Sequence, residues 1–316
     1  MLDNILLVGT GYMGNEYAKV LKGMKIHFIA VGRGETHAKA FESTYDTPVI
    51  RGGLDAWLKT DPALPHYAII ATNEDQLAPA AIALMERGLN NLLIEKPGGL
   101  TAQDVKKVGD KARETNTAAY IGYNRRFYAS TQTAKKLLTE DGGVLSFNFE
   151  FTEWVHKISE AQKQSEVGRN WFLANSTHVI DLAFFLGGKP KTLTAFTAGG
   201  LAWHPAASIY AGAGVSETGA LFNYQANWGA PGRWSVEIIT SAHRYIFRPL
   251  EKLAVQKIGS VAIDDIAIDD ALDVQYKPGL WREVESFLGD TTHLPDIHEQ
   301  VRALSWYKKI NGADHL

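Results

Sequence analysis

The residues best suited to chemistry in this sequence are a lysine, Lys96, and a histidine far from it along the chain, His178. Lys96 lies between Glu95 and Pro97 and follows the apolar run Asn91–Ile94. Such a run is typical of a buried parallel strand, and ligands bind at the carboxyl ends of the strands in an open α/β sheet. Since proline fixes the turn, we expect Lys96 to lie at a cofactor crevice. The alternative is that its ammonium only pairs with Glu95 or another surface carboxylate.

His178 lies three residues before Asp181, on an apolar stretch that includes Val179 and Leu182. Helical spacing places His178 and Asp181 on one face. A histidine in such a setting is often only a satisfied core residue. A His-x-x-Asp pair also suits a metal ion, but no third ligand follows at a fixed spacing, so we expect no metal. With Lys96 as its partner, His178 becomes a candidate general acid–base group.

A glycine-rich turn follows the first predicted strand, Asn4–Gly9, and precedes a helical pattern. Its arrangement is G-x-G-x-x-G in the strand–turn–helix context of dinucleotide sites. The first glycine permits a tight turn, the second allows backbone to approach a pyrophosphate, and the third allows close helix–strand packing. The helix N-terminus then attracts phosphate. The residues expected to hold a dinucleotide here are Gly9, Gly11, Tyr12, Met13 and Gly14. A turn without a ligand is the alternative.

The end of the second predicted strand, Ile26–Val31, bears on which dinucleotide binds. An NAD site usually has an acidic residue there for the ribose hydroxyls. This sequence has Arg33, 19 positions after Gly14, and no carboxylate before Glu35. A guanidinium forms a bidentate pair with phosphate, so we expect NADP, with NAD possible as the cofactor. The alternative is an exposed arginine beside an NAD site.

Further strands alternate with helical segments through the first 123 residues. One runs over His66–Ala71 and ends at Thr72 and Asn73, and another runs over Ala118–Gly122. This alternation predicts an α/β Rossmann domain, a doubly wound parallel sheet, over residues 1–123. Thr72 and Asn73 then lie at its ligand edge.

The pattern changes from Val144 onward, where alternating residues predict a half-buried strand. A helix is predicted over Trp171–Leu186, and a final amphipathic helix over Ile297–Ile310. Short strands follow one another without helices between them, which predicts an α+β domain, residues 124–316, with a large, mostly antiparallel open sheet. The short strands are predicted at Thr192–Thr197, Gly219–Tyr224, Arg233–Thr240, Tyr245–Arg248 and Leu253–Ile258. We expect the other face of this sheet to be apolar and to form a homo-oligomer.

The acidic repeat Asp264–Asp270 fits no cation-binding loop, and we interpret it as a solvated strand and turn.

Composition excludes several classes of function. The chain has 316 residues, 45% hydrophobic and 21% charged, as in an ordinary globular protein of two domains. A formal net charge of −3 favours neither nucleic acid nor an anionic membrane as partner. The absence of cysteine excludes a thiolate nucleophile. No signal-like segment or membrane-length apolar run is present, so we expect a cytoplasmic protein.

Together these motifs resemble the glucose–fructose oxidoreductase, inositol dehydrogenase and MocA family of NAD(P)-dependent oxidoreductases. The matching pieces are Gly9–Gly14, Ala71-Thr72, Glu95-Lys96-Pro97, Tyr123-Asn124-Arg125-Arg126-Phe127, and His178-Val179-Ile180-Asp181 before Gly187-Gly188. The Glu-Lys-Pro motif is the most specific of them. The resemblance implies that Lys96 is catalytic and touches both the substrate oxygen and the nicotinamide ribose, and that His178 is its acid–base partner. It also implies that Glu95, Pro97 and Asn124 belong to the cofactor site, with a Lys-Pro bond that is sometimes cis.

The sequence departs from the family pattern at two places. Many members have an aspartate four residues before the histidine, where this chain has Ala174. Many also have a histidine early in the helix after the fourth strand, where this chain has Gln76-Leu77. The Lys-Asp-His triad of the inositol dehydrogenases is thus incomplete, which makes an inositol-type substrate a poor fit.

These observations predict hydride transfer between a nicotinamide and a carbinol or ketone carbon of a sugar, sugar nucleotide or polyol. Aromatic walls with amide and guanidinium donors suit such a substrate. The candidate substrate residues are Arg125, Trp154, Arg169, Asn175, Asp181 and Trp228, with His204 as a weaker one. The competing hypothesis is a protein that senses NAD(P) or a sugar without turnover. Relatives with that role generally lack the catalytic pair.

Overall fold

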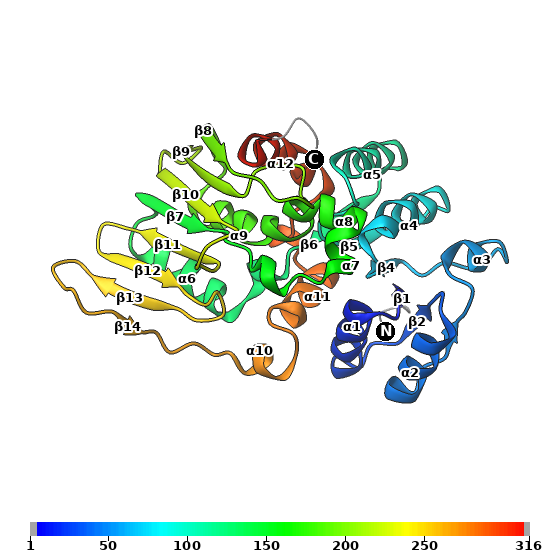
Figure 1. The fold of residues 1–316 in the computed structure, drawn as a ribbon. Helices are drawn as coiled ribbons and strands as arrows, with labels where there is room; N and C mark the ends of the chain where they lie inside the picture. Colours follow the sequence, from blue (N-terminus) through cyan, green and yellow to red (C-terminus); the bar gives the residue numbers. More distant parts are fainter. Residues whose placement is uncertain (1–4, 313–316) are drawn as a thin grey trace. The chain divides into compact units, whose positions relative to one another are not determined.

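The computed structural model describes residues 5–312, which form two compact units (Figure 1). The first unit contains the chain up to Tyr123 together with Leu280–Arg302. The second contains Asn124–Gly279 and the described residues from Ala303 onward. We predicted residues 124–316 as one domain, so the return of Leu280–Arg302 to the first unit is a correction. The predicted strand start at Asn4 lies outside the described residues.

The first unit is built on a six-stranded sheet in the order β3-β2-β1-β4-β5-β6, and all its pairs are parallel. This confirms the doubly wound Rossmann sheet. The strand order reverses between β1 and β4, the position where such sheets bind ligands. The strands are β1 (Ile5–Val8), β2 (Phe28–Val31), β3 (Val49–Ile50), β4 (Tyr67–Ile70), β5 (Asn91–Glu95) and β6 (Ala118–Gly122).

Helices flank this sheet, α1 packing with α2 and α11, and α4 packing with α5. A capping box begins α5, since Thr101 and Asp104 satisfy each other's backbone N–H groups. Helix α11 belongs here because the ring of Phe287 packs edge-on against Tyr67 and Tyr120. The helices are α1 (Tyr12–Gly23), α2 (Glu35–Tyr45), α3 (Leu54–Leu58), α4 (Glu74–Glu86), α5 (Ala102–Thr115), α11 (Leu280–Leu288) and the start of α12 (Ile297–Asn311).

The second unit contains an eight-stranded sheet in the order β14-β13-β12-β11-β7-β10-β9-β8. Only the β7–β10 pair is parallel, which confirms a mostly antiparallel sheet. Strand β9 was not predicted, because its Ala-Gly-Ala-Gly run has little strand character. The strands are β7 (Ser146–Glu150), β8 (Pro190–Ala198), β9 (Ile209–Ser216), β10 (Leu221–Asn227), β11 (Ser235–Ile239), β12 (His243–Phe247), β13 (Ala254–Lys257) and β14 (Asp264–Asp265).

Helix α9 (Thr177–Gly187) covers one face of this sheet. Phe184 on α9 packs edge-on against Phe147 and Phe149 of β7. A Cβ on Gly187 would lie 2.3 Å from the Phe147 ring, so glycine is required for this close approach. The predicted helix over Trp171–Leu186 begins differently, as a π-helical turn, η3 (Phe172–Ser176). Such turns are frequent at functional sites.

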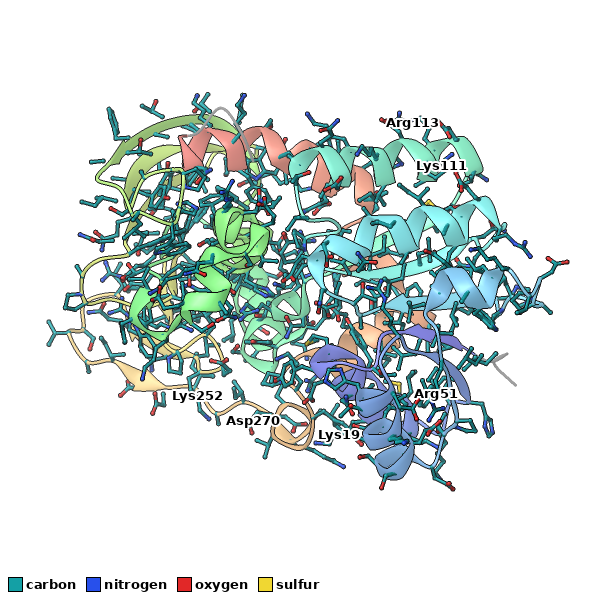
Figure 2. The ribbon with its side chains drawn as sticks, turned by 45° about the vertical axis from the view of Figure 1, so that its right-hand side comes forward. Lys19, Arg51, Lys111, Arg113, Lys252 and Asp270 are labelled. Atoms are coloured by element: carbon teal, nitrogen blue, oxygen red, sulfur yellow. The ribbon has the colours of Figure 1, made fainter. Side chains whose placement is uncertain are left out.

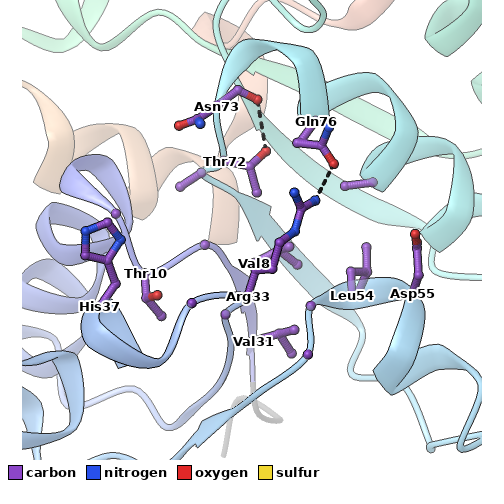
Figure 3. Close-up of a pocket in the computed structure, with 18 of the residues that line it drawn as sticks. Val8, Thr10, Val31, Arg33, His37, Leu54, Asp55, Thr72, Asn73 and Gln76 are labelled. Atoms are coloured by element: carbon purple, nitrogen blue, oxygen red, sulfur yellow. Dashed lines mark hydrogen bonds between the residues drawn. The ribbon is translucent and has the colours of Figure 1, made fainter. Parts of the chain in front are cut away.

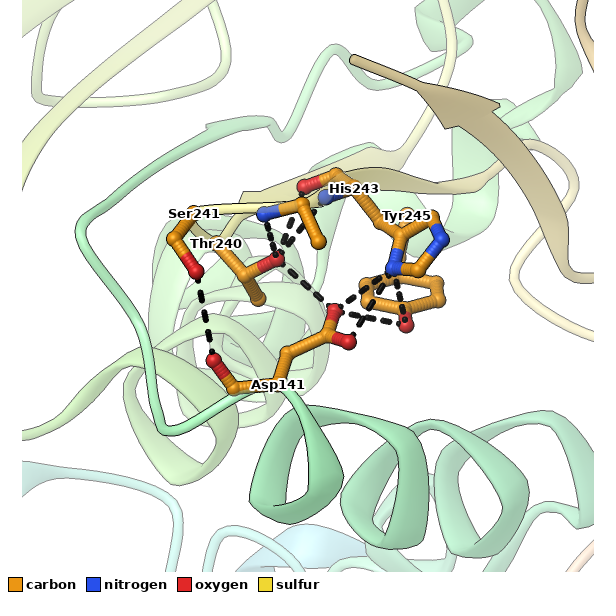
Figure 4. A network of polar contacts seen from close by, with 6 residues as sticks. Asp141, Thr240, Ser241, His243 and Tyr245 are labelled. Carbon is orange, nitrogen blue, oxygen red and sulfur yellow. Dashed lines mark hydrogen bonds and ion pairs between the residues drawn. The ribbon is translucent and has the colours of Figure 1, made fainter.

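Further helices complete the second unit. They are η1 (Asn124–Phe127), α6 (Ala129–Glu140), η2 (Val155–Lys157), α7 (Glu160–Gln164), α8 (Glu166–Arg169) and α10 (Ala271–Gln275), while η4 (Thr291–His293) lies in the first unit. A polar network joins the end of α6 to the β11–β12 hairpin (Figure 4). Its centre is Asp141, which accepts hydrogen bonds from Thr240 and Tyr245 at 2.8 Å and lies 2.9 Å from Nδ1 of His243.

The outer face of the eight-stranded sheet is more polar than predicted. Asn148, Asn223 and Glu237 lie side by side on it in β7, β10 and β11. Large apolar side chains lie on it too, among them Phe196, Leu221 and Ile209, which are 68%, 60% and 41% exposed. The alternating residues of the sequence correctly predicted the buried face of this sheet, but they did not predict how polar its exposed face is.

Charged side chains elsewhere on the surface form local ion pairs, among them those of Arg51, Lys111, Arg113 and Lys252. Figure 2 labels these four residues. Exposed pairs of this kind contribute at most about 1 kcal/mol each to stability. Each unit is therefore stabilised mainly by its own apolar core. No helix among residues 5–312 is both long and apolar enough to cross a membrane.

Candidate active site

A cavity of about 300 Å³ lies at the carboxyl ends of the first unit's parallel strands (Figure 3). It is open to the glycine-rich turn after β1 and to the ends of β2 and β4. Five of the predicted cofactor residues line it, namely Gly9, Gly11, Arg33, Thr72 and Asn73. His37, Asp55 and Gln76, which we did not predict as cofactor residues, line it too.

The three motif glycines have different physical roles. Gly9 has φ +114°, and a Cβ on it would lie 2.3 Å from the carbonyl oxygen of Ala71 at the end of β4. A Cβ on Gly14 would lie 2.0 Å from the Gly9 carbonyl oxygen. A Cβ on Gly11 would meet nothing within 4 Å. Gly9 and Gly14 are therefore needed for packing, whereas Gly11 leaves open space at the start of α1, where a phosphate is expected.

Two carbonyl groups of this turn accept hydrogen bonds from a side chain of the protein itself. The amide nitrogen of Asn15 donates to the carbonyl oxygens of Thr10 and Gly11, at 3.1 and 2.8 Å. These oxygens are acceptors that would repel a phosphate if they were turned toward it. Asn15 therefore favours a turn that presents N–H groups to the ligand, and it follows the motif directly in the sequence. Tyr12 and Met13 begin α1 beside it, and Tyr12 is 69% exposed.

Arg33 extends from the end of β2 into the cavity, where Nη2 donates to Oε1 of Gln76 at 2.6 Å (Figure 3). The first carboxylate after it, Glu35, is bound elsewhere, to Arg51 at 2.7 Å and to Lys39 at 3.3 Å. These two cations lower the pKa of Glu35. The guanidinium of Arg33 is thus oriented by the neutral amide of Gln76. This residue is one of the places where the sequence departs from the pattern of the family it resembles.

Lys96 directly follows the last residue of β5 and is the one residue of 92–99 that is not buried. The Lys96–Pro97 bond is cis. On one side of it, the buried carboxylate of Glu95 accepts from the Tyr17 hydroxyl at 2.7 Å, and that hydroxyl is also 3.0 Å from Oε2 of Glu283. Burial and the two carboxylates raise the pKa of Tyr17, so it remains a hydrogen-bond donor.

On the other side of Lys96, the amide of Gln300 donates to the carbonyl oxygen of Pro97 at 3.0 Å and to the hydroxyl of Tyr123 at 3.1 Å. Gln300 is 1% exposed. The backbone that carries Lys96 is therefore held by α1, α11 and α12. Glu283 and Gln300 both belong to Leu280–Arg302, the segment that returns to the first unit. Because this segment is so far from Lys96 along the chain, no local sequence pattern could have linked these residues to it.

In the second unit, His178 is the second residue of α9 and is 7% exposed. Its ring centre lies 6.0 Å from that of Trp234. One turn before it, Asn175 is the one residue of 172–184 that is not buried. The predicted pair is thus divided between the units, with Lys96 in the first and His178 in the second.

Glu153 is a buried carboxyl group beside the π-helical turn, and sequence analysis did not identify it. It accepts from the Asn175 amide at 2.8 Å and from the Ser176 hydroxyl at 2.7 Å. Burial raises its pKa, while these two hydrogen bonds and the charge of Arg233 act in the opposite direction. Because the amide of Asn175 donates to Glu153, its carbonyl oxygen remains as the acceptor. Glu153 thereby orients a partly exposed amide near His178, in a region where Ala174 supplies no carboxylate.

Other predicted substrate residues differ in their surroundings. Asp181 forms a buried bidentate pair with Arg126, with N–O distances of 2.8 and 2.5 Å, which accounts for its burial. Trp228 is 1% exposed and packs against Trp203 and His204, so it is a core residue in this unit rather than an open wall. Burial lowers the pKa of His204 to about 4.

The remaining candidates lie nearer the surface of the second unit or at its first helix. Arg169 is exposed and pairs with Glu166 at 3.7 Å. Trp154 is 42% exposed, and its indole N–H donates to the carbonyl oxygen of Gly232 at 2.7 Å. Asn124 is buried, with its amide donating to the carbonyl oxygen of Pro278 at 2.9 Å.

The described part of the chain, residues 5–312, contains no group of three or more His, Cys, Asp or Glu side chains that could hold a metal ion.

Comparison with known proteins supports the interpretation of the first unit. Residues 4–123 match the model of an oxidoreductase family with an NAD-binding Rossmann fold, GFO_IDH_MocA. A levoglucosan dehydrogenase of Pseudarthrobacter phenanthrenivorans is 28% identical over 61% of this chain and 53% of the relative. An uncharacterised oxidoreductase of Streptococcus pneumoniae serotype 4 is 26% identical over 60% of this chain and 51% of the relative. The chain spans about half the length of these curated relatives.

The whole fold also matches a solved structure. A levoglucosan dehydrogenase in complex with NADH and levoglucosan superposes with a TM-score of 0.78, covering 97% of this chain and 95% of that chain. The sequence identity over this match is 18%, so it shows the fold alone.

The glycine turn allows a paired prediction. Gly14→Ala should lower the free energy of unfolding by about 1–3 kcal/mol, because its Cβ collides with backbone. Gly11→Ala should leave stability within about 0.5 kcal/mol but weaken dinucleotide binding about tenfold or more, because its Cβ fills the space for phosphate. Denaturant unfolding and NADPH fluorescence titration measure the two effects. Equal dinucleotide affinity in wild type and Gly11→Ala would contradict this assignment of the turn.

The raised pKa of Glu153 predicts a dependence of stability on pH. Because the folded state holds the proton more tightly, this carboxyl stabilises the fold fully below its ordinary pKa of 4.5, and the contribution falls as pH rises through the folded-state pKa. The stability lost in Glu153→Gln should therefore shrink from pH 5 to pH 8, by up to about 1.4 kcal/mol per pH unit. Denaturant unfolding at several pH values measures this, with exposed Glu217→Gln as the control. A loss that grows with pH would show that Glu153 is ionised in the fold.

Proposed function

On the match of residues 4–123 to the model of the Gfo/Idh/MocA oxidoreductase family, we propose that the protein belongs to this family and is an NADP-preferring dehydrogenase or reductase. It transfers a hydride between the nicotinamide and a carbinol or ketone carbon of a sugar, sugar nucleotide or related polyol. The observation that carries the proposal is the placement of Lys96. It is the accessible residue at the carboxyl end of β5, in the sheet that also carries the glycine turn, and Tyr17 and Gln300 hold its backbone neighbours.

Lys96 is proposed to act on the substrate oxygen. Its ammonium donates a hydrogen bond to that oxygen and stabilises alkoxide character as the C–H bond breaks or forms. The bound nicotinamide supplies or accepts the hydride. The polar contacts on both sides of Lys96 matter because a misplacement of the order of 1 Å costs about 10²-fold in rate.

His178 is proposed to move the proton. On oxidation it takes the proton of the carbinol O–H, and on reduction it returns that proton to the oxygen. An imidazole suits this exchange because it gains and loses a proton close to neutral pH. Asn175, oriented by Glu153, presents a carbonyl oxygen that accepts from a substrate hydroxyl. A polyhydroxy substrate supplies such hydroxyls.

The proposed preference for NADP rests on Arg33. Its guanidinium lines the cavity, Gln76 orients it, and the carboxylate of Glu35 is engaged by Arg51. A 2′-phosphate is the group of the dinucleotide that a guanidinium binds best. NAD remains the alternative, and the solved relative described above is a complex with NADH.

A sugar is the proposed substrate class because the curated relative with the higher identity is a levoglucosan dehydrogenase. A cytoplasmic location and a homo-oligomer formed through the outer face of the eight-stranded sheet, with Phe196 and Leu221 in the contact, are further parts of the proposal. The second candidate function is a sensor of NAD(P) or a sugar without turnover, which the presence of both Lys96 and His178 disfavours.

The catalytic assignment predicts that Lys96→Met lowers kcat/KM about 10²–10³-fold and that His178→Asn lowers it about 10²–10⁴-fold. The assay follows nicotinamide absorbance with NADPH and a panel of keto-sugars. Lys107→Met, at an exposed lysine paired with Asp104, is the control and should keep full activity. Dinucleotide binding without turnover across the panel, with ligand affinity unaltered in Lys96→Met, would favour the sensor.

The cofactor assignment predicts that Arg33→Ala weakens NADP binding about 10- to 100-fold and leaves NAD binding nearly unchanged, because hydrogen bonds to a charged group are lost. Calorimetric titration of both dinucleotides measures this. Arg113→Ala removes the same charge at an exposed arginine paired with Asp110, outside the cavity lining, and should not alter the ratio of the two affinities. If wild type does not prefer NADP, or if the preference survives Arg33→Ala, the assignment is wrong.

A further inference from the structure

Two arginines of the second unit, Arg125 and Arg233, lie over the same aromatic ring. Their guanidinium carbons are 4.8 and 4.7 Å from the ring centre of Trp234. Within residues 5–312, neither guanidinium has a carboxylate at ion-pair distance. The charge of Arg233 acts to lower the pKa of the buried carboxyl of Glu153, but the two groups form no ion pair. Two positively charged guanidinium groups thus lie over one ring, and no carboxylate among residues 5–312 forms an ion pair with either of them.

Arg233 is fixed in place without an ion pair. Its backbone N–H donates to Oε1 of Glu150 at 3.1 Å, and the preceding carbonyl of Gly232 accepts from the indole of Trp154 at 2.7 Å. Its guanidinium also lies 4.6 Å from the ring centre of Trp154, so it contacts two indoles. Stacking uses the faces of a guanidinium and leaves the N–H groups in its plane available.

Among residues 5–312, the side chain of Arg125 is poorly satisfied. Its Nε is buried and has no hydrogen-bond partner there, and the one side-chain hydrogen bond that it makes there is long, 3.5 Å from Nη1 to Oδ1 of Asn124. Its backbone is held because its carbonyl oxygen accepts from the hydroxyl of Thr131 at 2.8 Å. A buried donor without an acceptor costs about 1–3 kcal/mol, so the protein holds this guanidinium here at a cost in stability.

Both cations contact the ring of Trp234, which itself lies beside the proposed proton-transfer group. Since each carbon is within 5 Å of the Trp234 ring centre, the two charges are at most about 10 Å apart, one Debye length at 0.1 M salt. The ring of His178 is 6.0 Å from that of Trp234. An anionic group within reach of both guanidinium groups would accept hydrogen bonds from their N–H groups and offset both charges.

We propose that Arg125 and Arg233, together with Trp234, form an anion-binding subsite that takes the carboxylate or phosphate of an acidic sugar. The sugar ring packs against the exposed indole of Trp154, and the bound anion places the sugar carbinol beside His178. This subsite deepens the proposed function, on which its relation to His178 rests. It narrows the substrate from sugars in general to sugars that carry an oxyanion.

Calorimetric titration tests the subsite with glucuronate, glucose 1-phosphate and neutral glucose as probes, in the presence of excess NADPH. We expect at least one anionic sugar to bind about tenfold or more tightly than glucose. Arg233→Met and Arg125→Met, which keep an apolar chain on the ring, should each weaken that binding about 10- to 100-fold and leave glucose binding unchanged. The better probe identifies the carboxylate or the phosphate as the recognised group.

Arg244→Met is the matched control, because this exposed arginine of β12 has a carboxylate neighbour in Glu237, and it should bind as wild type does. Arg233 is exposed, so Arg233→Met tests the subsite even if Arg125→Met fails to fold. The proposal is overturned if neither anionic sugar binds more tightly than glucose, or if tight binding persists in Arg233→Met. Anion binding without hydride transfer in any assay would retain the subsite and reject the proposed function.

Discussion

The close packing of Gly14 on Gly9, and of Gly9 on Ala71, is the constraint on which the nucleotide-binding half depends. A Cβ at Gly14 or Gly9 would lie 2.0 or 2.3 Å from a backbone oxygen, so the first strand, its turn and the first helix fit only with glycine there. That packing brings the start of α1 to the edge where β1, β2 and β4 end. The same edge carries Arg33 on one side and Lys96 on the other. One steric requirement therefore sets where phosphate, ribose and nicotinamide are expected to bind.

The reactive edge is also stabilised from a distant part of the chain. Glu283 and Gln300 belong to the segment that returns to the first unit, and they contact Tyr17 and the Pro97 carbonyl on either side of Lys96. A lysine side chain is flexible, so its position depends on how rigidly the backbone beneath it is held. The division of the chain into two units thus does not follow chain order, because part of the support for Lys96 comes from Gln300, 203 residues after Pro97.

Sequence patterns predicted those features that local chemistry determines. The glycine turn and the apolar parallel strands each have a signature within a few residues, and both are present. Features that depend on contacts between distant segments were missed: the return of α11, the carboxyl of Glu153 under Asn175, and the two arginines on Trp234. Trp228 was assigned to a substrate wall because its aromatic type suits a sugar, but burial decided otherwise. Strand β9 was missed because sheet pairing overrides the weak propensity of alanine and glycine.

The central claim is that this chain moves a hydride between a nicotinamide and a sugar carbon with Lys96 at the oxygen. The most direct measurement uses NADPH deuterated at the transferable position of the nicotinamide, incubated with a panel of keto-sugars and followed by mass spectrometry of the products. The account predicts deuterium on the new carbinol carbon, and at least a hundredfold slower transfer, of the order expected for a lost transition-state donor, in Lys96→Met. Dinucleotide binding with no deuterium transfer to any sugar, or equal transfer by Lys96→Met, would contradict it.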